Sequence, residues 1–130
     1  MKHYNVVAAV VCHDGKYLCM QKGKTKFEYT SYKWEFPGGK IELGETPQQA
    51  LARELMEEME YPVEVGEELV TLNHEYPDFS ITMTAFLCTP KGDANGFKRR
   101  EHADSKWCSK DELKGLNWAA ADVGVVASIL

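Results

Sequence analysis

Residues 39–61 read GKIELGETPQQALARELMEEMEY, and this stretch decides how the chain folds. It predicts a glycine-containing loop that leads into a helix over about residues 47–59. Thr46 is a good N-cap, Pro47 suits the first helical position, and Gln49 completes a capping box. One apolar stripe at helical spacing should pack this helix against a core, and it consists of Leu51, Leu55 and Met59.

Three carboxylates lie on the neighbouring, solvent-side face of the predicted helix. Glu54, Glu57 and Glu58 stand at i, i+3 and i+4, so they project from one side. Three like charges at such short distances repel one another. Hard ions such as Mg²⁺ take carboxylate oxygens, and often substrate phosphates, as ligands. Such a cluster therefore suits a divalent cation, although many acid-rich helix faces are only solvated surface. Arg53 falls on another flank, where it could brace a carboxylate.

This segment resembles the Nudix box, written G-x5-E-x7-R-E-U-x-E-E-x-G-U with U a bulky apolar residue. Its fixed positions are matched by Gly39, Glu45, Arg53, Glu54, Leu55, Glu57 and Glu58. Two positions depart from it, because Glu60 stands where the box has glycine and Tyr61 where it has an aliphatic residue. The family glycine lies just past the helix end, where a left-handed backbone is usual, and another residue there costs roughly 1–2 kcal/mol. Pro62 stops the helix in any case.

The resemblance covers essentially the whole chain and implies one domain over residues 1–130. The implied fold class is α+β, namely the Nudix fold, an α/β/α sandwich with a mixed β-sheet. Mg²⁺ is the implied cofactor, and Mn²⁺ is expected to substitute for it. The family's metal ligands correspond here to one backbone carbonyl and three carboxylates, those of Gly38, Glu54, Glu57 and Glu58. The resemblance also gives Arg53 the task of holding a catalytic glutamate and Glu45 that of supporting the loop and helix.

Two further segments narrow the resemblance to MutT-type nucleoside triphosphate pyrophosphohydrolases. Residues 34–42, WEFPGGKIE, look like the entry seen in those enzymes. Glu101 and His102, followed by Trp107, resemble the loop in which those enzymes place one further glutamate near the metals. Glu101 is therefore a candidate metal ligand or general base, and the alternative is a solvated acid in a basic loop. His102 could be a pH-tuned partner, although a lone exposed histidine usually is not.

Residues 118–122, WAAAD, align with the segment in which MutT-like enzymes read the base. The bacterial oxidised-guanine enzyme typically has asparagine where this chain has Asp122, and the CTP pyrophosphohydrolase group has aspartate. A carboxylate only accepts hydrogen bonds and so suits the amine of cytosine or adenine, whereas a protonated Asp122 could donate to oxidised guanine. The alternative is that Asp122 merely caps the last helix.

Aromatic, basic and glycine residues complete the expected substrate site. Candidates for stacking on the base, each of which could instead be ordinary packing, are Tyr29, Tyr32, Phe36 and Phe79. Residues 22–33 predict a mobile loop whose lysines, Lys22 first, could meet a triphosphate or simply be solvated. Gly38, Gly39 and Lys40 follow a short strand, and the glycines let the backbone approach an ion and phosphates closely.

Hydrophobic alternation and turn signals predict the remaining elements. The predicted strands cover residues 4–12, 16–21, 34–38, 63–75, 79–89 and 104–108, with turns at Asp14-Gly15 and Pro77-Asp78. A capping box from Ser109 to Glu112 opens a short helical turn that Gly115 closes. A last amphipathic helix, over about residues 122–130, is expected to turn its apolar side inward: Val123, Val126 and either Ile129 or Leu130.

The composition is that of an ordinary soluble domain. The 130 residues are 44% hydrophobic and 27% charged, and a net charge of −5 argues against unspecific binding to nucleic acid. The apolar run at residues 6–11 could pass for a short signal segment, but it has no cleavage-site pattern and predicts a strand. Nothing predicts a membrane span. The scattered cysteines lack metal-ligand spacing and indicate reduced, mostly buried thiols of a cytoplasmic protein: Cys12, Cys19, Cys88 and Cys108.

The resemblance implies a Mg²⁺-dependent hydrolase that converts a nucleoside triphosphate and water into the monophosphate and pyrophosphate. Cytosine-type or oxidised nucleotides are the expected substrates, in cleaning of the nucleotide pool, and a monomer or homodimer is expected. One alternative is a Nudix hydrolase of another nucleoside diphosphate derivative. A second is a non-catalytic Nudix-like binding module, which the intact carboxylates of the box argue against. A third, nucleic-acid binding through the basic segments at 22–33 and 98–100, conflicts with the overall acidity.

Overall fold

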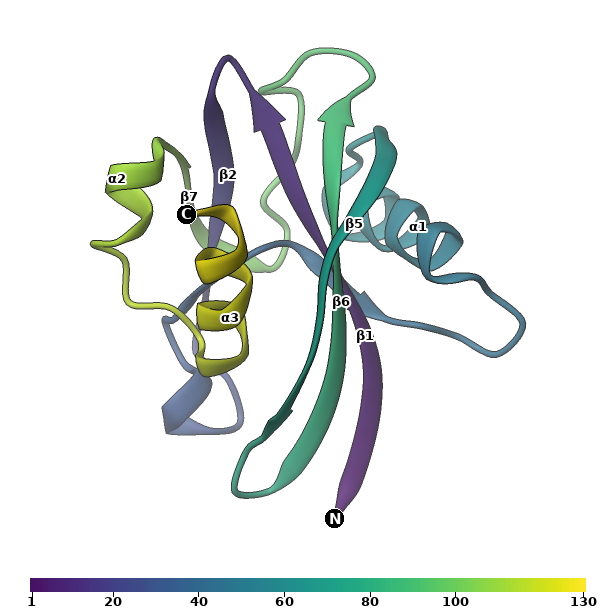
Figure 1. The fold of residues 1–130 in the computed structure, drawn as a ribbon, viewed down its shortest axis with the longest axis vertical. Helices are drawn as coiled ribbons and strands as arrows, with labels where there is room; N and C mark the ends of the chain where they lie inside the picture. Colours follow the sequence, from purple (N-terminus) through teal and green to yellow (C-terminus); the bar gives the residue numbers. More distant parts are fainter.

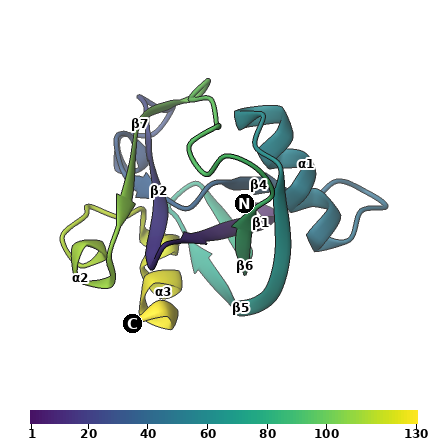
Figure 2. The ribbon, with the colours of Figure 1, turned by 90° about the horizontal axis from the view of Figure 1, so that it is seen from above.

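A mixed seven-stranded β-sheet lies between helices on its two faces in the computed structural model, which describes residues 1–130 (Figure 1). The elements in chain order are β1 (Lys2–His13), β2 (Lys16–Lys22), η1 (Glu28–Thr30), β3 (Trp34–Glu35), β4 (Gly38–Lys40), α1 (Pro47–Met59), β5 (Val63–Glu75), β6 (Phe79–Pro90), β7 (His102–Cys108), α2 (Lys110–Leu113) and α3 (Ala120–Ile129). The strand path is β3-β2-β1-β6-β5, with β4 also paired to β1 and β7 to β2. Figure 2 shows α1 on one side of β1 and α3 on the other. The predicted α+β sandwich with a mixed sheet is therefore confirmed.

The centre of the sheet is the parallel pair of β1 and β6, in which Lys2 lies opposite Phe79 and Val11 lies opposite Cys88. Parallel strands that are covered on both faces have continuous apolar runs. Residues 7–11 fit this rule, because none of them is more than 2% exposed. Their side chains alternate between a core under α1 and a second core under α3, so the strand supports both layers of the sandwich.

Both predicted turns connect antiparallel strands. Asp14 and Gly15 have φ values of 51° and 73°, the positive values that a two-residue hairpin between β1 and β2 requires. Pro77 and Asp78 lie between β5 and β6, whose antiparallel register is set along nearly their whole length. These hairpins form as predicted because their turn residues and the strand alternation act over short distances in the sequence.

Two expectations from the composition can be compared with the structure. All four cysteines are free thiols and three of them are buried, as predicted: Cys19, Cys88 and Cys108. None of the helices has both the length and the apolar character needed to cross a bilayer.

Helix α1 begins and ends as the sequence predicts. The Thr46 hydroxyl accepts a hydrogen bond from the Gln49 N–H at 3.1 Å, and the Gln49 side chain accepts one from the Thr46 N–H at 2.9 Å. The apolar stripe is fully buried and consists of Leu51, Leu55 and Met59. Glu60 ends the helix with φ 47° and ψ 45°, the left-handed conformation expected where the Nudix box has glycine. Tyr61, the second departure from the box, is 1% exposed, and its hydroxyl donates to the Ala94 carbonyl at 2.7 Å.

The prediction of one strand over residues 34–38 is wrong, because two short strands replace it. β3 pairs with β2 and β4 pairs with β1, so the chain crosses from β2 to β1 between residues 35 and 38. Pro37 has no N–H to give to a ladder, and the Phe36 N–H bonds to the Asp122 side chain instead of to a strand. The predicted loop over residues 22–33 also contains a 3-10 turn, η1.

The buried side of α3 also differs from the predicted one. The helix begins at Ala120, and Val123 and Leu130 are 55% and 53% exposed rather than turned inward. Val126 is buried as predicted and Ile129 packs against the core, while the rest of the buried side consists of Ala121, Asp122 and Val125. This helix is apolar nearly all round, so its residue pattern does not identify an inward face. The bond from Phe36 to Asp122 instead fixes which side faces the sheet.

Candidate active site

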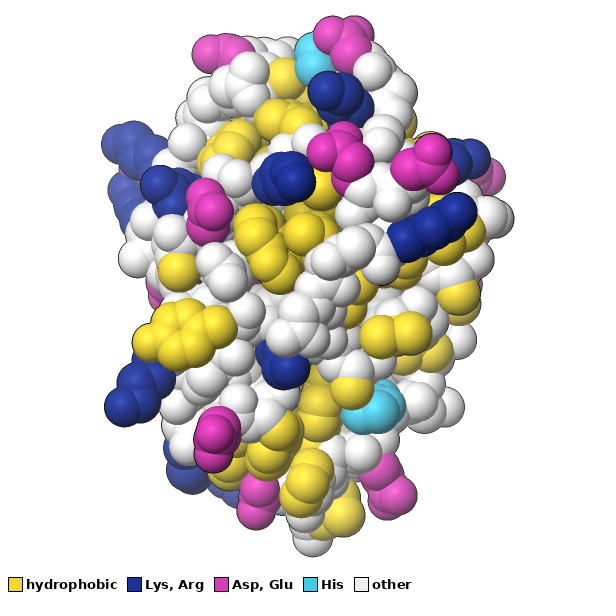
Figure 3. Space-filling model, turned by 90° about the vertical axis from the view of Figure 1, so that its left-hand side faces the viewer, with side chains coloured by type: hydrophobic (Ala, Val, Ile, Leu, Met, Phe, Trp, Pro, Cys, Tyr) yellow, Lys and Arg dark blue, Asp and Glu magenta, His cyan; other side chains and the backbone are white.

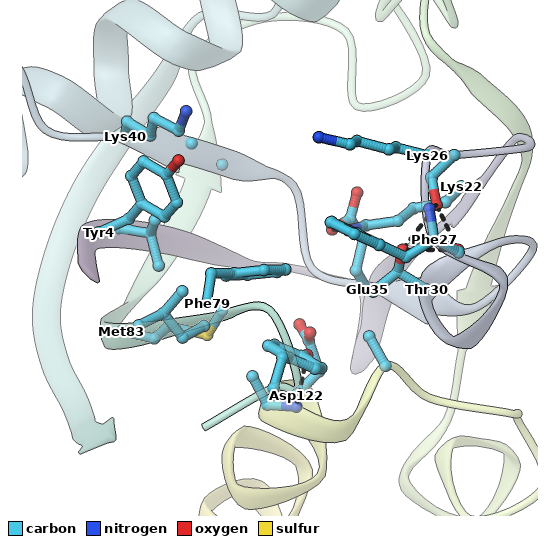
Figure 4. A pocket seen from close by; sticks show the side chains of 18 of the residues that line it. Tyr4, Lys22, Lys26, Phe27, Thr30, Glu35, Lys40, Phe79, Met83 and Asp122 are labelled. Carbon is cyan, nitrogen blue, oxygen red and sulfur yellow. Dashed lines mark hydrogen bonds and ion pairs between the residues drawn. The ribbon is translucent and has the colours of Figure 1, made fainter. Parts of the chain in front are cut away.

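A pocket of about 1150 Å³ opens between β1, β2, β4 and the start of α3 (Figure 4). Its volume slightly exceeds the roughly 300–1,000 Å³ that is typical of small-molecule sites. One end of the pocket is acidic and contains Glu35, Glu58 and Glu101. Figure 4 shows Asp122 below the ring of Phe79, while Lys40 and Lys26 stand on opposite sides of the opening. The pocket therefore combines acidic, basic and aromatic groups from several parts of the chain.

The carboxylates of α1 differ in how deeply they are buried. Glu58 lines the pocket and shares a hydrogen bond with the carboxyl group of Glu54. Burial, then this contact with Glu54, then the charges of Glu101 and Glu35, raise the pKa of Glu58 to about 8. The Glu54 side chain is 14% exposed, whereas that of Glu57 is 61% exposed. The prediction of a solvent-side face therefore holds for Glu57 and is wrong for the other two, which turn toward β4 and the pocket.

Two adjacent glycines allow β4 to approach its neighbours closely. A Cβ on Gly39 would lie 2.4 Å from the carboxyl carbon of Glu54, and one on Gly38 would lie 1.9 Å from the Val7 carbonyl oxygen. Both distances are far inside ordinary contact, so any other residue would displace the carboxylate or the backbone. Glycine at position 39 therefore makes room for the acid cluster, and glycine at position 38 permits the pairing of β4 with β1.

Arg53 is the cation that organises the carboxylates of α1. Its Nε donates to Glu45 at 2.6 Å, and its Nη1 donates to Glu54 and to Glu57 at 3.1 Å each. Its Nη2 donates to the Lys40 carbonyl at 3.0 Å, which joins the helix to the end of β4. The bonds from Arg53 also lower the pKa of Glu45 below its ordinary value. Arg53 thus fixes two carboxylates of its own helix, and Glu45 connects that arginine to the preceding loop.

The acid cluster fits a hard divalent cation by its ligand atoms and its charge. Carboxylate oxygens of Glu54 and Glu58, with a backbone carbonyl such as that of Gly38, are the ligand types that Mg²⁺ takes. Glu101 lines the same pocket from the loop before β7. A cation would relieve the repulsion that contributes to the raised pKa of Glu58. No three His, Cys, Asp or Glu side chains stand close enough together in this structure to hold an ion by themselves.

His102 and Glu35 form a partly buried pair in the wall of the pocket. The His102 side chain is 5% exposed and its Nε2 lies 3.0 Å from a carboxylate oxygen of Glu35, so the expectation of an exposed histidine is wrong. β7 begins at His102, earlier than predicted, and this residue pairs with Lys22 of β2. Glu35 also lies 3.5 Å from the Lys22 ammonium. Sequence reasoning missed Glu35, whose one signal is an acid between two aromatic residues of a short strand.

Asp122 is a buried acid at the other end of the pocket. It is 2% exposed, and its Oδ1 accepts a hydrogen bond from the Phe36 N–H at 3.0 Å. Ala119 is the N-cap of α3, so Asp122 lies inside the helix and the cap alternative is wrong. Burial, and then the charge of Glu35, raise the pKa of Asp122 to about 8. The side chain is therefore mostly protonated at neutral pH, and it can both donate and accept a hydrogen bond in the pocket.

Three phenylalanines line the pocket, namely Phe27, Phe36 and Phe79. Phe79, one of the predicted stacking candidates, lies with its ring centroid 5.8 Å from that of Phe27. Sequence reasoning missed Phe27, although it is an aromatic residue among the lysines of the predicted loop. Phe36 is a poor stacking candidate after all, because its ring is 2% exposed and stacks on Trp118 at 4.8 Å. Two other candidates do not line this pocket, namely Tyr29 and Tyr32.

Lysine side chains give the pocket a positive rim in a chain of net charge −5. The five that line it are Lys2, Lys22, Lys24, Lys26 and Lys40. The Lys40 ammonium lies 4.1 Å from the ring centroid of Tyr4, on one side of the opening. Lys33 instead donates to Asn117 at 3.2 Å, so not every lysine of the 22–33 segment reaches the pocket. A positive rim of this kind attracts anionic ligands.

The chain is similar to known proteins over its whole length. The NUDIX domain family matches residues 1–128. A CTP pyrophosphohydrolase of Escherichia coli (strain K12) is 34% identical over 131 residues, which covers 100% of this chain and 93% of that protein. An 8-oxo-dGTP diphosphatase of Proteus vulgaris is 40% identical over 90 residues, which covers 68% of this chain and 78% of that protein. The solution structure of a MutT protein from methicillin-resistant Staphylococcus aureus 252 has a TM-score of 0.75 and 39% identity, and covers 99% of this chain and 97% of its own.

Proposed function

Because the chain belongs to the Nudix hydrolase family, we propose that it hydrolyses a nucleoside triphosphate to the monophosphate and pyrophosphate, with Mg²⁺ as its cofactor. The observation that carries this proposal is one pocket with an acidic end at Glu58 and Glu101 and a separate buried acid, Asp122. The first end suits a metal and phosphates, and the second suits a base. The relatives named as CTP pyrophosphohydrolase and 8-oxo-dGTP diphosphatase support a triphosphate substrate.

The chemistry is divided among a small number of residues. The metal would be held by the Gly38 carbonyl and the carboxylates of Glu54, Glu57, Glu58 and Glu101. When bound, Mg²⁺ would neutralise charge on the phosphate oxygens and lower the pKa of the attacking water. Arg53 keeps Glu54 and Glu57 in place. Glu101 is the candidate base that accepts the proton of the water.

The positive rim and the two glycines of β4 would bind the polyphosphate. Lys22 and Lys40 line the pocket beside the acidic end, and Gly38 and Gly39 leave their backbone accessible there. Water attacks the β-phosphorus, so a new P–O bond forms there while the bond to the α–β bridging oxygen breaks. The monophosphate leaves with that oxygen, and the other two phosphates leave as pyrophosphate.

The base would enter toward Asp122, with Phe79 and Phe27 beside it. A protonated Asp122 both donates and accepts, so it suits oxidised guanine as well as cytosine. An ionised Asp122 only accepts, so it suits the amine of cytosine or adenine but cannot donate to a carbonyl oxygen of oxidised guanine. The raised pKa of Asp122 therefore makes the choice of base depend on pH.

Asp122→Asn should remove this pH dependence. The asparagine amide donates at every pH, whereas Asp122 stops donating as pH rises through about 8. An unmet hydrogen bond in a pocket costs about 1–3 kcal/mol, so at pH 9 the variant should favour oxidised guanine over cytosine by roughly tenfold more than the wild type does. The measurement is kcat/KM for 8-oxo-dGTP and for CTP between pH 6.5 and 9. Asp111→Asn, on an exposed position of α2, is the control. The same base ranking in wild type and Asp122→Asn at pH 9 would remove Asp122 from base recognition.

A substrate panel tests the proposed function itself. Natural and oxidised nucleoside triphosphates, in ribo and deoxyribo forms, would be assayed for release of monophosphate and pyrophosphate with Mg²⁺ present. Turnover of a cytosine or oxidised nucleotide with these two products is expected. Cleavage of nucleotide sugars or dinucleotides instead would favour another Nudix chemistry. Saturable binding of nucleotides with no cleavage of any of them would favour a binding module.

Nucleic acid is not a proposed partner of this protein. The chain carries a net charge of −5, and unspecific binding to nucleic acid depends on a continuous basic surface. Figure 3 shows basic, acidic and hydrophobic side chains interspersed on the side that carries α2 and α3. The lysines at the pocket are better explained by a small polyphosphate, because they line one open pocket together with acidic and aromatic side chains.

A further inference from the structure

Glu60 keeps a side chain in a backbone conformation that favours glycine. Its φ of 47° and ψ of 45° lie in the left-handed region, where a Cβ is unfavourable. The side chain is engaged in two contacts, because one carboxylate oxygen accepts from the Lys98 ammonium at 2.9 Å and also from the Arg100 guanidinium. The hydrogen bond from Lys98, and then the charge of Arg100, lower the pKa of Glu60. The strained position therefore makes contacts that glycine could not make.

Residues 98–100, just before β7, are bound to the end of α1 by the two contacts of the Glu60 side chain and by two further hydrogen bonds. The Lys98 N–H donates to the Met59 carbonyl at 2.8 Å, and the Arg100 side chain donates to the Glu57 carbonyl at 3.3 Å. The last carbonyls of a helix have no partner within it, and cations are favoured beside them. Glu60 adds a negative charge at the same place, so side-chain and backbone groups together hold residues 98–100 against the helix.

Glu101 follows directly and is restrained from both sides. Arg100 precedes it in contact with Glu60. His102 follows it in the ladder between β7 and β2, with its ring on Glu35. Glu101 lines the pocket together with Glu58, and its charge contributes to the raised pKa of Glu58. The direction of Glu101 is thus set by two anchors, one at each neighbouring residue.

We propose that Glu60 is a positioning residue, which binds Lys98 and Arg100 at the end of α1 and thereby holds Glu101 at the acidic end of the pocket. The inference rests on the proposed function, in which Glu101 is a metal ligand or base. The side chains of Glu60 and Arg100 are 40% and 51% exposed, and ion pairs so exposed add little to stability. The contribution of Glu60 therefore lies in the placement of Glu101.

Glu60→Gly and Glu60→Gln together separate the side chain from the backbone. Glycine removes the carboxylate and the left-handed strain, whereas glutamine keeps the strain and the length but loses the charge. Both variants should lower kcat about tenfold with KM changed less than about twofold. The glycine variant should also unfold at a higher temperature than the glutamine variant. A loss of kcat in the glycine variant alone would assign the effect to backbone freedom and overturn the proposal, as would full kcat in both.

A matched control and a double variant identify the route of the effect. Asp111→Asn removes an exposed ion pair with Lys114 on α2 and should leave kcat unchanged. In a Glu101→Gln background, Glu60→Gly should change kcat less than about twofold, because the group through which it acts is already altered. Independent, multiplying losses would show that Glu60 acts elsewhere, and would overturn the proposal.

Two measurements do not depend on turnover. Amide hydrogen exchange over residues 98–102 should be faster in both Glu60 variants. The Mn²⁺ dissociation constant should rise about tenfold in both, as for other residues that orient a metal ligand. If the wild type hydrolysed no nucleotide, the proposed function would be refuted. The hydrogen-exchange and Mn²⁺-binding measurements would still show whether Glu60 positions Glu101. Unchanged exchange and Mn²⁺ affinity in both variants would refute the positioning role even in an active enzyme.

Discussion

Glu58→Gln should lower kcat by about 10³-fold and, in the metal-free protein, should increase stability against unfolding at pH 8. Activity falls because glutamine keeps the volume but removes a charged ligand oxygen. The loss of several kcal/mol of transition-state stabilisation lowers the rate by about three powers of ten. Stability increases because burial and the adjoining Glu54 raise the pKa of Glu58 to about 8, so the ionised form is disfavoured in the folded protein. One substitution should thus act in opposite directions on activity and on stability.

The sign of the pH dependence follows from the raised pKa. Glu58 contributes stability that is fully present below its ordinary pKa of 4.5 and is lost as pH rises through about 8. The metal-free wild type should lose stability over this window, and Glu58→Gln should lose less. Thermal unfolding at pH 5, 6.5 and 8, alongside kcat, measures both effects.

Two other glutamates serve as comparisons for Glu58→Gln. Glu57→Gln should also lower kcat, but it should not stabilise the metal-free protein at pH 8, because the Glu57 side chain is 61% exposed. Glu64→Gln, at an exposed position of β5, should change neither quantity. Near-full kcat in Glu58→Gln would make Glu58 a supporting residue rather than a ligand.

Removal of divalent cations should abolish turnover, and Mg²⁺ or Mn²⁺ should restore it. The acidic end of the pocket has carboxylates that repel one another, and a bound cation would offset this repulsion and supply the electrophile that the metal-free site lacks. Mg²⁺ should also raise the unfolding free energy, by about 2.7 kcal/mol at a concentration of 100 times its Kd. Glu58→Gln should show little of this stabilisation, which serves as the control. Undiminished turnover in excess chelator would refute the metal-dependent mechanism.

The parts of the structure that the sequence predicts are those encoded by neighbouring residues. Thr46 and Gln49 cap α1 across one turn, and Asp14-Gly15 closes a hairpin within two residues. The spacing of Glu54, Glu57 and Glu58 likewise places three carboxylates on one helix without knowledge of the rest. Which of them is buried depends on where β4 and the loop before β7 lie, and no local pattern carries that information.

The features that the sequence does not predict join distant segments. Glu35 contacts His102 across 67 positions, and Phe36 contacts Asp122 across 86. The second of these bonds fixes the buried side of α3, which an almost wholly apolar helix leaves undecided. The same bond explains why Asp122 is buried in the pocket instead of capping its helix.

The main pairing partner of β1 is β6, so β1 lacks this partner until most of the chain has been synthesised. His3 and Ser80 bond to each other across the sheet although 77 positions separate them. Contacts of such separation form slowly, because a long loop must close first. Until β6 has been made, residues 6–11 are an apolar strand with an open edge, which can associate with other nascent chains. A fragment ending at residue 75 should therefore aggregate rather than fold, and a folded, monomeric fragment in solution would show that the hairpin and α1 suffice without β6.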